Sequence, residues 1–500
     1  MILLKQNVQD YNNDLRAMIM AFFPGEKIVS YEKKQEDNES FCFMMEAFFD
    51  DKKTSLTLIK PDGLKVCDKD INGNYSDRKE FRNIFKLALY RLLSDFTGKR
   101  LPWGDLTGVR PTKIAMKAVK EEKEKNEILD YYIKTYDTSE RKAALAFEVA
   151  KNELGLINGI DLKNSYCLYI GIPFCPSRCL YCSFAAYAIE SKKDKVDGYL
   201  DRLCEELSFI AKKYKDKNLV AIYMGGGTPT SVNYKQLDRL LTHVDKVFDL
   251  HNKENIDDDT EKDAGMNKKL LEYTIEAGRP DSITKEKLLV MKKHGVTRIS
   301  INPQTMNDET LKRIGRAHSV KQLEDAYEMA RECGFDNINM DIIAGLPGED
   351  KAMMERTLTK IRDMKPESLT VHSLAIKRAA KLNESLDEYK ADINHDVDEM
   401  LDMVNDTAED LSMKPYYLYR QKNIGGNLEN VGYALAGKEC LYNVLIMEEL
   451  TDIIAAGAGA SSKYVIRDEN DNVIRIDRSE NCKSLDDYID RFDEMIARKC

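Results

Sequence analysis

The sequence contains no run of 18 apolar residues that could span a bilayer. Its first residues, MILLKQNVQDYNNDL, turn polar after four positions and lack the apolar region of a signal peptide. Basic residues are outnumbered by acidic ones: the sequence has 76 Lys and Arg but 86 Asp and Glu, so the net charge is −10. We therefore expect a cytoplasmic protein without a membrane span. A nucleic-acid partner is not expected, because no basic surface is available for a phosphate backbone.

The sequence also lacks a paired cysteine framework. Its 11 cysteines are an odd number, which is typical of a reducing compartment where thiols stay free or bind metal. With 500 residues, 43% of them hydrophobic and 32% charged, the chain can form several globular domains. We expect an N-terminal α+β module (1–160), a central domain (161–380) and a C-terminal α/β extension that closes the active site (381–500).

Three of the cysteines are concentrated in the stretch CLYIGIPFCPSRCLYCSFAAY, residues 167–187. Cys175, Cys179 and Cys182 have the spacing Cys-x3-Cys-x2-Cys. Residues 167–172 are predicted to form a buried strand, and Pro173 ends it because proline has no N–H to donate. The cysteines therefore lie on a loop, where three thiolates can surround one metal centre.

The number of thiols decides between metal centres. A closed iron–sulfur cube or a structural zinc site takes four ligands, so three thiolates leave one metal position open for a substrate or cofactor. Zinc is the weaker alternative, because no second Cys-x2-Cys or His pair follows within zinc-finger spacing. A disulfide with a spare thiol is weaker still in a chain with no mark of secretion.

From residue 167 onward, apolar runs alternate with amphipathic helical segments. Ser191 with Asp194, and Ser319 with Gln322, have the spacing of capping boxes that begin helices. Six strand–helix units predict an α/β fold, an open partial barrel of the (β/α)6 type. The six predicted strands are 167–172, 219–224, 272–277, 298–303, 338–343 and 368–374.

Barrels of this type carry their active sites on the loops at the carboxyl ends of the strands. The chemically unusual residues lie at these ends: the three cysteines, the GGGTP segment at 225–229, Glu276, Gln304, Asp341 and His372. Glu276 and Asp341 interrupt apolar runs, so polar partners should meet them, because an unpaired buried charge is expensive. His243, His251 and His294 lie away from these ends and are expected at the surface.

The regions outside the barrel give fewer signals. Strands are predicted at 40–49 and 55–60, with a helix at 80–96. The only tryptophan, Trp103, is expected to be a packing anchor between modules. Further helices are predicted at 397–411 and 484–499, with a hairpin before the second.

The segment YIGIPFCPSRCLYC resembles the signature loop of radical S-adenosylmethionine (radical SAM) enzymes, more narrowly the oxygen-independent coproporphyrinogen dehydrogenases and their HemZ-type branch. The segments TIEAGRP, ISINPQTMNDETLKRIGRAH and MDIIAGLP resemble the family's SAM-binding segments. The resemblance implies that the three cysteines hold a 4Fe–4S cluster and that Tyr169, Gly226 and Glu276 contact the SAM bound to it. It also implies a second SAM, at Tyr181, Gly227, Thr228, Gln304, Arg316, Asp341 and Ala375, and it places Ala460 in the SAM pocket.

The function implied by this resemblance is the oxidative decarboxylation of coproporphyrinogen III propionates to vinyl groups, with an electron donor or acceptor as a further partner. Lys377, Arg378 and Arg420 are the candidate cations for the substrate's carboxylates. Two departures keep alternatives open: Gly171 stands where the established dehydrogenases carry histidine, and Phe184 where they carry a further cysteine. The alternatives are a non-catalytic haem chaperone and an anaerobic haem-degrading methyltransferase.

Overall fold

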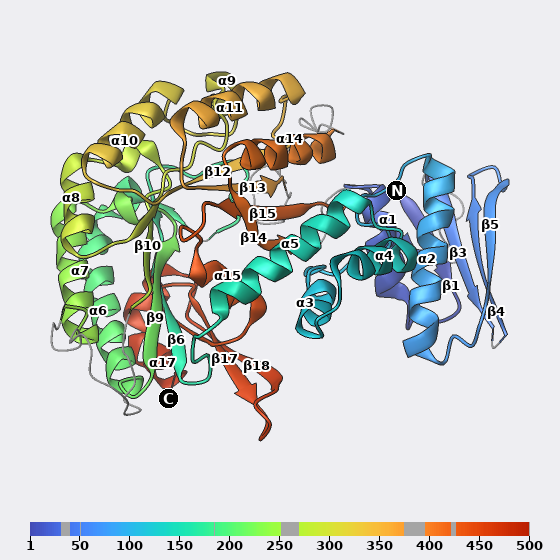
Figure 1. Cartoon of the computed structure of the whole chain (residues 1–500), viewed down its shortest axis with the longest axis horizontal. Coiled ribbons are helices and arrows are strands. Elements are labelled where there is room, and N and C mark those ends of the chain that lie inside the picture. Colours follow the sequence, from blue (N-terminus) through green and yellow to red (C-terminus); the bar gives the residue numbers. More distant parts are fainter. Residues whose placement is uncertain are drawn as a thin grey trace. The chain divides into compact units, whose positions relative to one another are not determined.

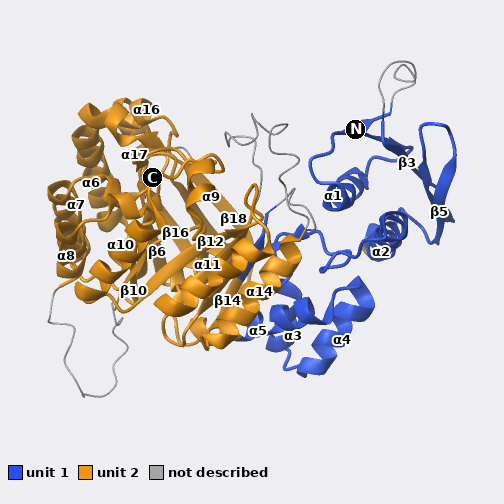
Figure 2. Cartoon of the chain, turned by 90° about the horizontal axis from the view of Figure 1, so that it is seen from above, with its two compact units in different colours: residues 1–151, 418–430 blue, residues 152–417, 431–500 orange. Residues whose placement is uncertain are grey.

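A computed structural model of the chain (Figure 1) describes residues 1–31, 41–50, 52–184, 186–251, 270–374, 396–421 and 427–499. The chain forms two compact units, which Figure 2 shows in different colours. The first consists of residues 1–151 and 418–430, and the second of residues 152–417 and 431–500. In the described ranges, no helix combines the length and the apolar character needed to cross a membrane.

The first unit contains a mixed sheet in the order β2-β1-β3-β4-β5. The predicted strands β3 and β4 are present, and β3 buries every second residue against the core. β1 was not predicted, because its residues ILLKQ show no such alternation. The strands are β1 (Ile2–Gln6), β2 (Ile28–Ser30), β3 (Phe43–Phe49), β4 (Lys53–Ile59) and β5 (Lys65–Asn72).

Helices α1 (Asn12–Phe22) and α2 (Arg78–Thr97) share one apolar core with this sheet. The Asp77 side chain accepts a hydrogen bond from Glu80 N where α2 begins, and Gly98 ends the helix in a left-handed conformation. Three further helices follow along the chain: α3 (Lys113–Lys120), α4 (Lys125–Tyr136) and α5 (Glu140–Ile157), whose last residues belong to the second unit.

Trp103 is fully buried and is an anchor of the first unit. Its indole Nε1 donates to Glu429 Oε2 at 2.6 Å, and the Arg420 guanidinium lies 5.3 Å from its ring centre. Lys142 Nζ forms a buried ion pair with Glu429 Oε1 at 2.9 Å. These contacts join residues 418–430 to the N-terminal part of the same unit.

The second unit contains the six predicted parallel strands, in their predicted order, and the predicted α/β fold is confirmed. β6 and β12 are buried along almost their whole length, as expected for parallel strands covered by helices. The strands are β6 (Ser165–Ile172), β9 (Asn218–Gly226), β10 (Glu272–Glu276), β11 (Arg298–Ser300), β12 (Ile338–Ala344) and β13 (Ser368–Ser373).

Helices cover the outer face of this sheet (Figure 1). The predicted capping box of Ser319 and Gln322 begins α10. The predicted box of Ser191 and Asp194 is wrong: Ser191 Oγ donates instead to Ala188 O, inside a 3-10 turn that precedes α6. The helices are α6 (Val196–Lys213), α7 (Tyr234–Phe248), α8 (Lys285–Lys293), α9 (Asp308–Arg313), α10 (Val320–Glu332) and α11 (Lys351–Met364).

The C-terminal part of the chain extends the barrel sheet at both edges. β15 (Glu429–Ala434) pairs antiparallel with β13 and lies next to β14 (Lys414–Arg420). At the other edge β16 (Asp452–Ala456) pairs parallel with β6, and the hairpin of β17 (Ser461–Arg467) and β18 (Val473–Glu480) follows. The strand that leads to the cysteine loop therefore has a neighbour on each side.

Among the described residues of the C-terminal part, four helices remain. The predicted helix at 397–411 is confirmed as α14 (Val397–Asp410), whereas α15 (Leu441–Glu448) was not predicted. The predicted single helix at 484–499 is wrong: the chain forms α16 (Leu485–Asp490) and α17 (Phe492–Ala497), separated at Arg491.

Candidate functional site

The three predicted metal-binding cysteines lie on the loop that follows β6, at the carboxyl end of the barrel strands. Cys179 is buried, and Cys175 and Cys182 are partly buried. Leu180 N donates to Ile314 O at 3.0 Å, which fastens the middle of the loop to the residue after α9. Burial raises the pKa of Cys175 to about 11, and the neighbouring Cys182 and Cys179 thiols add to this shift.

These thiols have the chemistry of a metal centre. A thiol with so high a pKa keeps its proton at neutral pH until a metal ion replaces it. Thr228 Oγ1 donates to Cys175 Sγ at 3.4 Å, a contact that also suits a thiolate. Three cysteines on one loop fit a metal centre that keeps one coordination position for another ligand.

Arg279 supports the cysteine loop, and the sequence did not single it out. The residue is buried, and its guanidinium donates to Ser177 O at 3.2 Å, to Ser177 Oγ at 3.1 Å and toward Cys179 Sγ at 3.6 Å. An ion pair with Asp281 at 2.7 Å holds the guanidinium in place. The available signal in the sequence was its position three residues after Glu276, in the segment TIEAGRP.

Glu276 ends β10 and meets the polar partner that its burial requires. Tyr223 OH donates to Glu276 Oε1 at 2.5 Å. Gly225 makes this arrangement possible, because a Cβ there would lie 2.8 Å from the carboxyl carbon of Glu276. Burial raises the pKa of Glu276 to about 7, against the lowering effect of the Tyr223 hydrogen bond. The carboxyl group can thus hold or release a proton near neutral pH.

Three tyrosine rings lie beside this carboxyl group. Tyr223 stacks on Tyr442 with ring centres 4.5 Å apart, and Tyr169 lies 6.3 Å from each of them. Gly226 approaches the predicted contact residue Tyr169, whose hydroxyl lies 3.1 Å from the position of a Cβ at Gly226. The structure therefore brings Tyr169, Gly226 and Glu276 together on three adjacent strands, of which Gly226 and Glu276 are the last residues.

Asp341 also has polar partners. Its carboxylate accepts hydrogen bonds from Asn302 Nδ2 at 2.8 Å and from Asn339 Nδ2 at 2.7 Å, and His372 Nε2 lies 3.9 Å away. Burial opposes ionisation, but the contacts with His372 and Asn339 outweigh it, so the pKa of Asp341 is lowered. Asp341 is therefore an anion at neutral pH.

Gln304 and Arg316 complete this side of the site. Gln304 has φ of 64°, and its backbone pairs with β12 through Asp341 O and Ile343 N. Arg316 is buried, and it donates to Tyr181 OH at 3.2 Å and to Asn302 O at 2.6 Å. Arg316 thus joins the cysteine loop to the end of the fourth strand.

The remaining predicted residues are more scattered. Gly227 N donates to Ile172 O at 2.8 Å beside the cysteine loop, and Ala460 lies buried on the turn between β16 and β17. Arg420 belongs to the first unit, where its guanidinium donates to the carbonyls of Leu106 and Gly108. Ala375, Lys377 and Arg378 lie outside the described residues.

His318 follows Arg316 by two residues and is buried, with both ring nitrogens lacking a hydrogen-bond partner among the described residues. Burial lowers the pKa of His318 to about 4, and the Arg316 charge acts in the same direction. His318 is therefore neutral at physiological pH.

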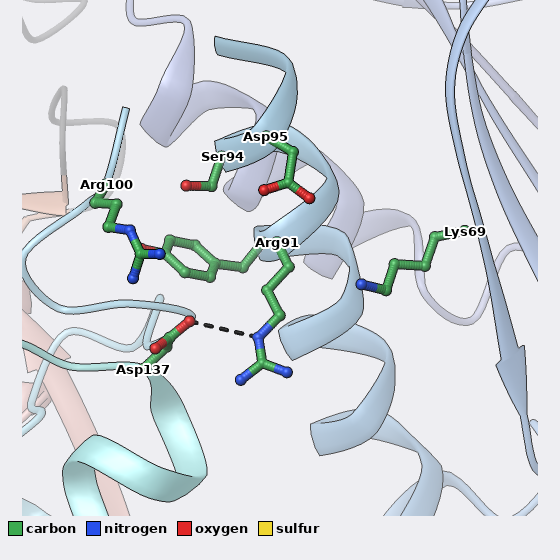
Figure 3. Close-up of a pocket in the computed structure, with 7 residues that line it drawn as sticks. Lys69, Arg91, Ser94, Asp95, Arg100 and Asp137 are labelled. Atoms are coloured by element: carbon green, nitrogen blue, oxygen red, sulfur yellow. Dashed lines mark hydrogen bonds and ion pairs between the residues drawn. The ribbon is translucent and has the colours of Figure 1, made fainter. Parts of the chain in front are cut away.

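The first unit contains a separate pocket of about 290 Å³, shown in Figure 3. Arg91 Nε pairs with Asp137 Oδ2 across it at 3.4 Å. Charges of both signs line its wall, which does not match the mostly apolar lining of a large-ligand site. The lining residues are Lys69, Tyr90, Arg91, Ser94, Asp95, Arg100 and Asp137.

Comparison with known proteins agrees with this geometry. The model of the radical SAM superfamily matches residues 169–361, which include the cysteine loop and β9 to β12. The oxygen-independent coproporphyrinogen-III oxidase-like protein HemZ of Bacillus subtilis is 39% identical over 84% of this chain and 81% of its own length. This chain belongs to the HemZ-like proteins of the radical SAM superfamily.

Other relatives match shorter parts of this radical SAM protein. The heme chaperone HemW of Bacillus subtilis is 36% identical over 42% of the chain and half of its own length. The oxygen-independent coproporphyrinogen III oxidase of Escherichia coli is 28% identical over 42% of the chain and 41% of its own length. The solved structure of Escherichia coli HemN matches the fold with a TM-score of 0.50 and 23% identity, over 69% of this chain and 72% of that one.

As a radical SAM protein, the chain uses a 4Fe–4S cluster and S-adenosylmethionine. The residues present fit these groups. Three thiols on one loop match a cube that leaves one iron free, and Arg279 and Thr228 place donors beside two of the sulfurs.

Proposed function

We propose that this protein oxidatively decarboxylates propionate side chains of coproporphyrinogen III to vinyl groups in the cytoplasm of cells that lack oxygen. The observation that carries this proposal is the 39% identity to HemZ over 84% of the chain, because that likeness extends well beyond the cluster-binding barrel. The polar groups around Asp341 support it, since they form a second polar region beside the cysteine loop.

The proposal gives each residue of the site a role. Cys175, Cys179 and Cys182 would hold the cluster, and Tyr169, Gly226 and Glu276 would contact the SAM bound to it. A second SAM would lie against Tyr181, Gly227, Thr228, Gln304, Arg316 and Asp341, with Ala375 as a further candidate. Ala460 would line the SAM pocket.

When bound, the cluster and SAM supply a carbon radical that can take a hydrogen atom from a substrate. Each propionate must lose one hydrogen atom, one electron and CO2 to become a vinyl group, so an electron acceptor is also required. The task of the chain's own residues is to orient the reacting groups and to exclude water. Arg316 joins Tyr181 to Asn302 after the fourth strand, and the Glu276 carboxyl group can hold a proton near neutral pH.

A haem chaperone is the second candidate. One observation in its favour is the 36% identity to HemW, which extends over 42% of the chain. A second is Phe184, which is 63% exposed and stands where the established dehydrogenases carry a further cysteine. A protein of this kind would bind haem without converting a porphyrinogen.

The deciding experiment is anaerobic incubation of the reconstituted protein with SAM, a reductant, an electron acceptor and coproporphyrinogen III, followed by mass spectrometry. We expect the substrate to lose two CO2, and Cys179→Ala to abolish both the cluster and the product. Stoichiometric haem binding by a cluster-loaded protein that leaves the porphyrinogen unchanged would overturn the proposal in favour of the chaperone.

Two variants test the assignment of the SAM sites. Glu276→Ala should weaken SAM binding at the cluster, whereas Gln304→Ala should spare this binding and lower product formation. Equilibrium binding of SAM and product formation are measured for both. Identical behaviour of the two variants would mean that only one SAM site exists.

A further inference from the structure

A second cluster of metal-binding side chains lies at the end of the barrel opposite the cysteine loop. Asp245 is in the last turn of α7, His251 follows that helix, and His294 follows α8. Each offers one ligand atom, and these atoms lie within 4.8 Å of one another. The helices lie side by side (Figures 1 and 2), and each runs back from the carboxyl end of one strand to the start of the next.

The carboxylate of Asp245 is the centre of the cluster. Its Oδ2 lies 3.0 Å from His251 Nε2 and also contacts His294 Nδ1. A tetrahedral ion with bonds of about 2 Å separates its ligands by roughly 3.3 Å, so these atoms are close to the spacing that a metal needs. The burial of His294 corrects its predicted surface position.

The second nitrogen of His294 has the partner that a metal-bound histidine requires. His294 Nε2 lies 2.8 Å from Asp238 Oδ1, one of the carboxylates of α7. Histidines that bind a metal through one nitrogen commonly donate the other N–H to a carboxylate, which fixes the ring. Asp238 therefore occupies the supporting position of a carboxylate–histidine–metal arrangement.

Two buried oxygen atoms at this place have no hydrogen-bond partner among the described residues: Asp245 Oδ1 and the hydroxyl of Tyr273 on β10. Burial raises the pKa of Tyr273 well above its usual value, and the Asp245 carboxylate adds to this shift. A metal ion bound at this carboxylate would give Asp245 Oδ1 a partner.

We propose that Asp245, His251 and His294 bind one divalent transition-metal ion of the zinc type, with Asp238 orienting His294. Two imidazoles and one carboxylate are ligands that Zn²⁺ accepts, with water in the fourth position. The site links the ends of α7 and α8 near the amino ends of the strands, the face of such barrels that serves stability rather than catalysis. The ion is therefore structural, and the inference is independent of the proposed function.

The test uses the full chain with its 4Fe–4S cluster assembled, so that the cluster cysteines are occupied. Zn²⁺ is titrated into the protein by calorimetry, and Co²⁺ is used as a spectroscopic probe. We expect one equivalent of Zn²⁺ to bind and to raise the melting temperature, and Co²⁺ to show d–d bands without a thiolate charge-transfer band.

His251→Gln is the informative variant, because its side chain is 56% exposed and its loss leaves the core intact. It should bind Zn²⁺ at least about tenfold more weakly, while its melting temperature without zinc and its iron content stay unchanged. His243→Gln is the matched control on α7, since His243 contacts Ser208 Oγ and Cys204 O instead. Equal zinc affinity in the wild type and His251→Gln, absence of binding, or a thiolate band with Co²⁺ would overturn the proposal.

Discussion

Buried charges determine how single residues act in the site. Arg279 contacts Ser177 through two atoms and lies next to the Cys179 sulfur, while its partner Asp281 keeps the guanidinium in a fixed orientation. A lysine could supply the same charge, but it could not make these separate contacts at once. The planar guanidinium is therefore what holds the cysteine loop.

Arg279→Lys should loosen this loop and weaken the cluster. Partners that support metal ligands commonly change metal affinity by about 10- to 100-fold, so we expect iron to be lost to a chelator about tenfold faster. Iron content and visible absorbance are followed over time in anaerobic protein. Arg239→Lys on α7, where Arg239 pairs with Asp201 at the surface, is the control and should behave as the wild type. Equal rates in the two variants would contradict a positioning role for Arg279.

Glu276 should make the stability of the cofactor-free protein depend on pH. Burial raises the pKa of Glu276 to about 7 in the folded state, whereas the unfolded value is lower. The unfolded chain therefore ionises first, and the folded state loses stability as pH rises through about 7. The free energy of unfolding of Glu276→Gln, relative to the wild type, should therefore be about 2 kcal/mol greater at pH 8 than at pH 5.

Denaturant unfolding at the two pH values measures this difference, and Gln304→Ala serves as a neighbour without an ionising group. A stability difference between Glu276→Gln and the wild type that does not change with pH would show that the carboxyl group is already ionised at pH 5.

At the scale of elements, the strands that could be predicted are those whose own residues form a recognisable pattern in the sequence. The barrel strands are buried on both faces, so they appear as apolar runs, and the cysteine spacing is visible without any structure. β16 was not predicted as a barrel strand, because its pairing with β6 depends on residues far away in the chain. The Arg279 contacts and the Tyr223–Tyr442 stack were missed for the same reason.

Gly457 allows β16 to approach β6. It has φ of 104°, and a Cβ there would lie 2.6 Å from both Gly171 O and Tyr199 OH. Its N–H donates to the buried carboxylate Glu206 at 2.8 Å. The end of β16 therefore has no room for a side chain.

Gly457→Ala should destabilise the protein by about 2 to 4 kcal/mol, through backbone strain together with the steric clash. Gly437→Ala is the matched control, because Gly437 also has positive φ, 78°, but has open space where a Cβ would lie. Chemical denaturation compares the two variants. A similar loss of stability in both variants would mean that Gly457→Ala is destabilising through backbone strain alone, with no contribution from a steric clash.

At the scale of the whole molecule, the chain divides into two units, and the first is made from two separate parts of the sequence. Glu429 connects them, since it accepts from Trp103 and pairs with Lys142. Because Trp103 is the only tryptophan of the protein, its fluorescence reports on this unit.

Glu429→Gln should lower the stability of the first unit by about 3 to 5 kcal/mol, because Lys142 would keep a buried charge without its ion-pair partner. Tryptophan fluorescence in denaturant follows this unit, while the visible absorbance of the cluster follows the second. The double variant Lys142→Met with Glu429→Gln should recover part of the loss. An unchanged fluorescence midpoint in Glu429→Gln would contradict the structural role of the pair.

The pairing of β16 with β6 also has a consequence for synthesis on the ribosome. β6 and its cysteines leave the ribosome long before β16, which comes much later in the chain. Until β16 arrives, β6 has an open edge that can pair with other chains. Delivery of iron and sulfide should therefore follow synthesis of β16, and ribosome-stalled chains that end before residue 452 should emerge without a cluster.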